Sequence, residues 1–376
     1  MFSDGISSII GSITKKKGKM KRILSEYREE RVCRMAKRKY RILFGILLML
    51  VFCGGCTDGS APSDGTIHST DTAMGTIVRQ TVYVDGQEEI TSDILKNITD
   101  LEQNFLSWRL DSSEIYRVNE AVGREEGVQL SEELSDILVS CMEVSDASEG
   151  AFDITIGEVV RLWDIDEWAV VHEPLDYVIP DAQTVAEELE YSGYEKIELR
   201  DNTLFLPDRM QLDLGAVGKG IALDCIREYL EGQDEVTGAV ISVGGSVLTY
   251  GSKPDGRPWR VGVVNPKDTS QNLGYLTLHG QWCVSTSGDY ERYVELDGVR
   301  YHHILDPATG FPADSGVSSV TILTKDGLLS DALSTACFVL GSQKGTVLAE
   351  QFGAEALFVD KNGNITMTKG MEKFYN

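Results

Sequence analysis

The chain has 376 residues and a formal net charge of −24, with 59 Asp and Glu against 35 Lys and Arg residues. This length is enough for one or two domains with a full hydrophobic core. A surface this acidic repels nucleic acid and anionic lipid, so we exclude polynucleotide binding, whereas divalent cations would be tolerated.

The charge is divided unevenly along the chain. Residues 1–55 hold 13 Lys and Arg against 4 acidic residues, and residues 56–376 hold 22 against 55. A basic stretch ending at Arg41 precedes the 11-residue apolar run 42–52, which has the length of a signal-peptide core and is too short to span a bilayer comfortably. The small residues that follow resemble a bacterial lipoprotein signal in which Cys56 becomes lipidated. An uncleaved anchor helix is the alternative.

This pattern predicts three parts: a basic region with a lipoprotein signal at 1–55, a flexible tether at 56–70, and a folded domain at 71–376. The expected location is the outer face of the cytoplasmic membrane, with the lipid anchor at Cys56.

Hydrophobic periodicity predicts alternating helices and strands in the folded domain. Helices are expected at 94–105, at 134–144 with Ser131 as N-cap, at 221–230, and at 329–340 closed by Gly341. One more helix is expected to open with the Pro- and Asp-rich stretch around 174–181 and to end at 189. Strands are expected at 76–83, 196–199, 203–206, 239–243, 247–250, 259–264, 275–278, 281–284 and 317–323, before a last helix and a hairpin of 356–359 with 365–367. The mixture predicts an α+β fold with largely antiparallel sheets and flanking helices.

The stretch Asp213–Gly220 contains three glycines between a predicted strand and a predicted helix. A Gly-rich turn that leads into a helix directs backbone N–H groups and the positive end of the helix dipole toward an anion. The glycine spacing matches neither a phosphate-binding P-loop nor the dinucleotide fingerprint. An anion site and an ordinary tight turn both remain open on local grounds.

Two further patterns carry possible chemistry. Asp331 and Thr335 are four residues apart, so on a helix they share a face and could bind one hard cation together with backbone carbonyls. Helix capping by Asp331 and a back-bonded Thr335 would explain the same spacing. His302 and His303 are adjacent in a strand-like segment, so at most one faces a cleft, where a neutral imidazole can act as a general base.

Taken in order, these clusters resemble the ApbE family of flavin transferases, whose members join FMN from FAD to a Thr or Ser of another protein. The resemblance runs from about Thr72 to the C-terminus. It is carried by Met74–Thr76, Phe105–Trp108, Asp111–Ile115, Gly150–Asp153 with Trp163, Asp213–Gly220 with Asp224, Ser242–Gly245, Ser285–Gly288, His303–Gly310, and Asp331 with Thr335.

The resemblance implies specific roles for matching residues. FAD contacts are expected from Met74, Trp108, Ala151, Phe152, Asp153, Asp213, Lys219 and Leu305. Magnesium is expected to bind the backbone carbonyl of Ala216 and the side chains of Asp331 and Thr335. Lys219 would neutralise charge on the diphosphate, and His303 is the candidate base. Trp108 and Phe152 could stack on the flavin or the adenine, or belong to the core.

The implied function is magnesium-dependent transfer of FMN from FAD to a Thr or Ser hydroxyl of an acceptor flavoprotein, with release of AMP. The acceptor would be a protein such as a subunit of a membrane redox complex. Two alternatives stay open. One is an FAD diphosphatase that uses water as acceptor, and the other is a flavin-binding lipoprotein without catalysis.

Overall fold

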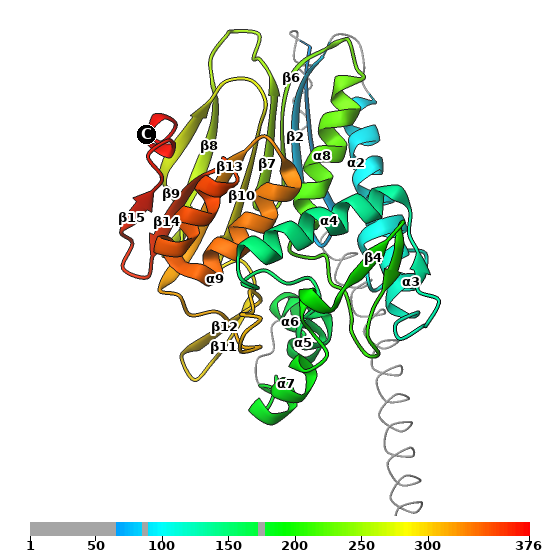
Figure 1. Ribbon diagram of the computed structural model, residues 1–376. Helices are drawn as coiled ribbons and strands as arrows, with labels where there is room; N and C mark the ends of the chain where they lie inside the picture. Colours follow the sequence, from blue (N-terminus) through cyan, green and yellow to red (C-terminus); the bar gives the residue numbers. More distant parts are fainter. Residues whose placement is uncertain (1–64, 85–88, 172–176) are drawn as a thin grey trace, which may run out of the picture. The chain divides into compact units, whose positions relative to one another are not determined.

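The computed structural model describes residues 65–84, 89–171 and 177–376 (Figure 1). The predicted signal, Cys56 and most of the predicted tether lie outside these residues. The rest of the tether does not: strand β1 begins at Thr66, so residues 66–70 belong to a sheet. The sequence Thr66–Ala73 is polar because β1 is a sheet edge with no fully buried side chain, which explains why periodicity did not reveal it.

One eight-stranded sheet organises the chain, and every neighbouring pair of its strands is antiparallel, as predicted. In spatial order its strands are β1 (Thr66–Ala73), β2 (Thr76–Val84), β6 (Val236–Val243), β7 (Ser246–Gly251), β10 (Trp282–Gly288), β13 (Val317–Thr324), β14 (Glu355–Asp360) and β15 (Ile365–Met367). Sequence neighbours pair through short turns at β1–β2, β6–β7 and β14–β15, so most of the sheet forms from local hairpins.

Helices cover one face of this sheet (Figure 1). The helices α2 (Ile90–Leu101), α8 (Gly218–Glu231) and α9 (Gly327–Gln351) pack on this face, and α4 (Glu132–Ala147) packs against α9. The helices α3 (Glu114–Asn119), α5 (Gly157–Trp163), α6 (Ile165–Val171) and α7 (Ala182–Leu189) lie outside this layer. Ile94 of α2 and Ile226 of α8 join Val78 and Val82 of β2 in one apolar cluster. Ala332 of α9 packs in a second cluster with strand β13. None of the helices in the described ranges is long and apolar enough to cross a membrane.

A hairpin of β8 (Trp259–Asn265) and β9 (Asp268–Leu278) covers the opposite face of the sheet. Trp259 and Leu276 from this hairpin pack with Leu323 of β13 and Leu357 of β14. Strand β13 is therefore enclosed on both faces, and all eight of its residues are buried. This explains why β13 is a nearly continuous apolar and hydroxylic run rather than an alternating one.

A smaller apolar cluster lies beside the main core and is centred on Trp163, which is 1% exposed. It joins α5 and α7 to the hairpin of β11 (Tyr293–Leu296) and β12 (Val299–His302). The remaining described elements are the sheet of β3 (Val128–Gln129), β5 (Thr203–Phe205) and β4 (Glu198–Arg200), a π-helix at Glu102–Leu106, and 3₁₀ turns at Tyr194–Lys196 and Met371–Lys373.

One predicted boundary agrees with the structure and one differs. The helix expected to end at Gly341 is broken there, with φ 77° and ψ 173°, but a second helical segment continues directly to Gln351. This second segment is the last helix expected from the sequence. The strand expected just before the Gly-rich stretch ends at Phe205, and α8 begins inside the stretch at Gly218. Gly218, Lys219 and Gly220 are therefore the first turn of a helix and not a loop.

Candidate active site

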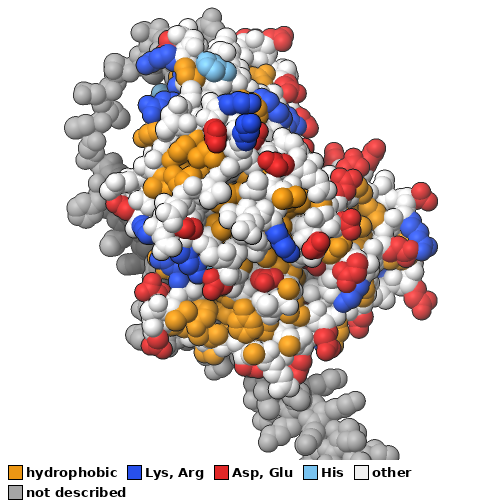
Figure 2. Space-filling view, turned by 60° about the vertical axis from the view of Figure 1, so that its left-hand side comes forward, with side chains coloured by type: hydrophobic (Ala, Val, Ile, Leu, Met, Phe, Trp, Pro, Cys, Tyr) orange, Lys and Arg blue, Asp and Glu red, His pale blue; other side chains and the backbone are white. Residues whose placement is uncertain are grey.

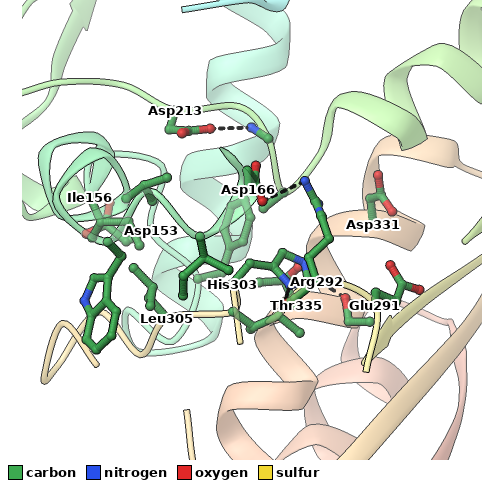
Figure 3. A pocket seen from close by; sticks show the side chains of 18 of the residues that line it. Asp153, Ile156, Asp166, Asp213, Glu291, Arg292, His303, Leu305, Asp331 and Thr335 are labelled. Carbon is green, nitrogen blue, oxygen red and sulfur yellow. Dashed lines mark hydrogen bonds and ion pairs between the residues drawn. The ribbon is translucent and has the colours of Figure 1, made fainter. Parts of the chain in front are cut away.

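A cleft with about 1060 Å³ of empty space opens among α5, α6, the first turns of α8 and α9, and the segments that flank the β11–β12 hairpin (Figure 3). Eleven of the twelve residues predicted to contact FAD or magnesium or to take part in catalysis line it: Trp108, Ala151, Phe152, Asp153, Asp213, Ala216, Lys219, His303, Leu305, Asp331 and Thr335.

Asp331 is the most enclosed of the charged groups in the cleft, with 3% of its surface exposed. The backbone N–H of Gly220 donates to its Oδ2 at 2.7 Å, and the Ser246 hydroxyl donates to its Oδ1 at 2.9 Å. The Lys219 ammonium lies 3.8 Å from Oδ2. The N-terminus of α8 therefore does receive an anion, but that anion is the protein's own carboxylate. Both interpretations of the Gly-rich stretch were incomplete, because neither included a partner 111 residues away.

The residues around Asp331 fit a hard divalent cation. A carboxylate offers about four lone-pair sites, and the bonds from Gly220 and Ser246 use two of them. The Thr335 hydroxyl lies in the same cleft and makes a single long contact of 3.5 Å with the Ser287 hydroxyl. With Ala216, these residues offer a carboxylate, a hydroxyl and a backbone carbonyl, which is the all-oxygen donor set that Mg²⁺ prefers. They would form a site with one carboxylate, and the described residues contain no cluster of three or more His, Cys, Asp or Glu suited to a metal.

His303 follows β12 directly and lines the cleft, whereas His302 is buried with its Nε2 3.1 Å from the carbonyl of Ala313. Only one of the two histidines faces the cleft, as expected. The Nδ1 of His303 lies 3.2 Å from the carbonyl oxygen of Arg292, which also accepts the His303 backbone N–H at 3.1 Å. Because a carbonyl can only accept, Nδ1 carries the proton and Nε2 is left as a proton acceptor.

The surroundings of His303 favour the neutral ring. Burial holds the pKa of His303 well below its usual range, and the nearby positive charges of Arg292 and Lys219 lower it further. Charging the imidazole is disfavoured both by desolvation and by repulsion. A ring that stays neutral at physiological pH, with a fixed tautomer, is suited to accept a proton from a hydroxyl.

The two predicted stacking residues differ in their surroundings. Phe152 is 2% exposed and belongs to the main apolar core, so the core interpretation holds for its ring. The ring of Trp108 is engaged by two guanidinium groups, with Arg109 at 4.0 Å and Arg161 at 4.6 Å from the ring centroid. A flavin that stacks on Trp108 would therefore compete with these cation–π contacts.

Asp153 and Asp213 are both held by backbone N–H groups. Asp153 accepts from Thr155 at 2.8 Å and from Tyr194 at 3.0 Å, which ties the segment after α4 to the turn after α7. Asp213 accepts from Gly215 at 2.6 Å. Burial raises the pKa of both carboxyls, and these hydrogen bonds oppose the rise. Their bonding shows that each aspartate shapes the wall of the cleft.

Met74 is the predicted contact that does not line the cleft. It forms the turn between β1 and β2 with Gly75, and both residues have positive φ, at 51° and 67°. Two successive positive φ values are typical of the tight turn that suits a hairpin. A Cβ atom on Gly218 would lie 3.2 Å from the Met74 Cε, so this side chain packs against the start of α8. Its position indicates a supporting role for the site.

Five charged residues of the cleft were not among the predicted contacts: Arg109, Asp164, Asp166, Glu291 and Arg292. The Arg292 guanidinium and the Asp166 carboxylate form an ion pair at 2.9 Å that joins α6 to the segment before β11 (Figure 3). Glu291 is exposed over part of its surface, but desolvation of its carboxyl raises its pKa, against the opposing effect of Lys219 and Arg292. A sequence signal was present for two of them, since Glu291 and Arg292 come three and four residues after the matched Ser285–Gly288 strand end.

The charge balance of the cleft favours a cation. Six carboxylate side chains line it against three cationic ones. The acids are Asp153, Asp164, Asp166, Asp213, Glu291 and Asp331, and the cations are Arg109, Lys219 and Arg292. A substrate with a diphosphate would therefore meet net negative charge, and a divalent ion would reduce the resulting repulsion.

Comparison with known proteins agrees with the resemblance seen in the sequence. The model of the ApbE family matches residues 74–358. An FAD:protein FMN transferase of Klebsiella pneumoniae is 34% identical over 312 residues, which cover 81% of this chain and 93% of that protein. One of Treponema pallidum is 32% identical over 347 residues, 86% and 93% of the two chains. The crystal structure of the ApbE protein from Thermotoga maritima superposes with a TM-score of 0.72 at 32% identity, covering 83% of this chain and 99% of that one.

The environment of His303 predicts a pH dependence of stability. Its pKa in the folded chain lies well below the usual 6.5, so at lower pH the unfolded chain binds the proton more readily than the folded one. This contribution of His303 lowers the free energy of unfolding as the pH falls below about 6.5 and is absent above that pH. This contribution to the free energy of unfolding is measured by urea unfolding of the wild type and of His303→Gln at about pH 7.5 and about pH 5.5.

We expect the loss of stability between the two pH values to be smaller in His303→Gln than in the wild type. The exposed His279, changed to Gln, controls for substitution at a histidine outside the cleft. Equal losses in the wild type and His303→Gln would show that His303 takes up its proton as easily in the folded chain as in the unfolded one.

Proposed function

The chain belongs to the ApbE family, and we propose that it transfers the FMN half of FAD to a Thr or Ser hydroxyl of an acceptor flavoprotein in a magnesium-dependent reaction that releases AMP. The observation that carries the proposal is the cleft itself. It brings a neutral histidine, a lysine and an oxygen-donor cluster around Asp331 to one cavity from segments far apart in the sequence. Positioned charge of this kind is what phosphoryl-type transfer requires.

The proposed reaction exchanges one P–O bond for another. The acceptor hydroxyl oxygen attacks the phosphorus of the FMN half, and the bond from that phosphorus to the AMP oxygen breaks. The hydroxyl proton passes to Nε2 of His303, which the carbonyl of Arg292 leaves free to accept it. AMP leaves as a phosphate monoester, and FMN remains joined to the acceptor through a phosphodiester.

Lys219 and the oxygen cluster would act on the diphosphate. The Lys219 ammonium is held near Asp331 and lines the cleft, so it can contact a phosphate oxygen as negative charge grows on the leaving group. Asp331, Thr335 and the carbonyl of Ala216 would hold Mg²⁺, which when bound supplies charge neutralisation for the diphosphate. Asp331 would then bind both Mg²⁺ and the start of α8, because its carboxylate also accepts the Gly220 N–H.

The acceptor distinguishes transfer from hydrolysis. Water is present at about 55 M, but an oriented hydroxyl can reach an effective molarity of about 10⁵ M or more. We expect slow AMP release from FAD alone, and much faster release with a flavoprotein segment that carries an accessible Thr. The full-length chain is incubated with FAD, Mg²⁺ and this segment, and covalent flavin is read as in-gel fluorescence beside a Thr→Ala acceptor control.

Each alternative has its own outcome in this assay. AMP release that is equal with and without acceptor, and no fluorescent acceptor, would establish an FAD diphosphatase. Bound FAD with no AMP under any condition would establish a flavin-binding protein without turnover. Fluorescence on the Thr→Ala acceptor equal to that on the parent would rule out the proposed hydroxyl as the attachment point.

Replacing Asp331 by Asn tests the cation ligand. The amide keeps the size of the side chain but removes its charge, and we expect Mg²⁺-dependent AMP release to fall by about 100-fold or more. Asp326→Asn is the matched control, because Asp326 is an exposed N-cap of the same helix. Near-normal turnover of Asp331→Asn would place the cation elsewhere.

We further propose that Cys56 carries a lipid that tethers the folded domain to the outer face of the cytoplasmic membrane, where membrane redox subunits would be acceptors. Residues 56–376 hold 55 acidic against 22 basic side chains, and acidic groups are spread over the face seen in Figure 2, so this part of the chain offers little attraction to anionic lipid. A membrane location then depends on the N-terminal segment. We expect Cys56→Ser with its native signal to leave the membrane fraction. Retention equal to the wild type would favour the uncleaved anchor helix.

A further inference from the structure

The first turns of α8 and α9 exchange hydrogen bonds in both directions. The N–H of Gly220 on α8 donates to Asp331 on α9, at 2.7 Å. In return, the N–H groups of Gly327 and Leu328 on α9 donate to the two carboxylate oxygens of Asp224 on α8, at 2.9 and 2.8 Å. Each aspartate lies four residues after the glycine of its own helix. The two helices thus hold each other through the same glycine-to-aspartate spacing.

The backbones of the two helices touch at these glycines. A Cβ atom on Gly220 would lie 2.1 Å from the carbonyl oxygen of Gly327, and one on Gly327 would lie 2.2 Å from the carbonyl oxygen of Gly220. Neither position can accept a side chain without moving a helix. The contact and the paired hydrogen bonds together define one relative placement of α8 and α9.

Asp224 differs from an ordinary helix cap. Asp326 is the ordinary cap of α9, since its side chain accepts from Leu329 three residues ahead in the same helix. Asp224 binds the same helix end from another helix, and Arg227 holds its carboxylate through a contact of 2.5 Å. Asp326 can stabilise only the first turn of α9, whereas Asp224 also determines where that turn lies relative to α8.

The position of that turn matters for the cleft. Asp331 lies one helical turn after Gly327, and Lys219 immediately precedes Gly220. If the first turn of α9 moved away from α8, Asp331 would lose the Gly220 N–H and its approach to Lys219, and the oxygen cluster with Ala216 would open. We infer that Asp224, outside the cleft, is a positioning residue that holds Asp331 in place for a divalent cation. The role of Asp331 as a cation ligand rests on the proposed function, whereas the contacts between α8 and α9 do not depend on it.

Hydrogen exchange separates positioning from simple stabilisation. Amide exchange is followed at Gly220 in the full-length chain for the wild type, Asp224→Asn and Asp326→Asn. The Gly220 amide bonds to Asp331 and not to Asp224. A change at Asp224 therefore reaches this amide only if the reciprocal contacts couple the first turns of α8 and α9. We expect exchange at Gly220 to become about tenfold faster in Asp224→Asn, the factor that corresponds to about 1.4 kcal/mol of local stability. It should stay at the wild-type rate in Asp326→Asn.

An unchanged Gly220 rate in a folded Asp224→Asn chain would overturn the inference, and so would equal acceleration in both variants. If Asp224→Asn does not fold, Arg227→Met is measured in its place. That variant keeps the carboxylate and removes the cation that holds it, and a smaller acceleration at Gly220 is expected. Unchanged exchange at Gly220 in Arg227→Met would then count against coupling between α8 and α9.

Binding of Mn²⁺, added alone as a substitute for Mg²⁺, gives a second readout. We expect its dissociation constant to rise about tenfold in Asp224→Asn and to stay unchanged in Asp326→Asn. Unchanged Mn²⁺ affinity in Asp224→Asn with faster Gly220 exchange would refute the link to the cation. A wild type that binds no Mn²⁺ would contradict the proposed magnesium site. The exchange result would still decide whether Asp224 couples α9 to α8.

Discussion

The close backbone contact between Gly220 and Gly327 is the constraint on which the arrangement of the cleft depends. It lets the first turns of α8 and α9 approach without intervening side chains, and each turn then donates to an aspartate of the other helix. The bodies of both helices rest on the same face of the eight-stranded sheet, which sets the direction from which they meet (Figure 1). Lys219, Ala216 and Asp331 come together in the cleft as a result of this meeting.

Most charged side chains of the cleft have a hydrogen-bond or ion-pair partner within the protein. The carboxylates of Asp153 and Asp213 accept backbone N–H groups, and Asp331 accepts one backbone and one side-chain donor. The cations are engaged as well, because Lys219 lies near Asp331 and Arg292 pairs with Asp166. An anionic substrate therefore has to share or exchange these partners when it binds. Such exchange adds a cost that depends on ionic strength and on any divalent cation present.

The sequence identified the cleft's main residues, and the structure adds contacts that the sequence did not indicate. Asp153 and Asp213 were expected as direct contacts, and their hydrogen bonds show that they also hold the walls together. Met74 was expected at the flavin; its side chain lies against the start of α8 and outside the lining of the cleft. Asp166 and Arg292 were missed because neither lies within a motif that matches the family. Their ion pair joins two segments 126 positions apart, which no local pattern records.

What the sequence determined by itself was the class of the fold, the buried faces of its longer elements, and the family to which the chain belongs. These follow from periods of two and 3.6 residues and from ordered motifs, which are local properties of the chain. Only the tertiary structure decided that the anion at the Gly-rich stretch is Asp331, that His303 has its tautomer set by Arg292, and that Asp224 holds α9. The reason is physical: such contacts join backbone groups of distant segments, and their geometry exists only after the helices have packed on the sheet.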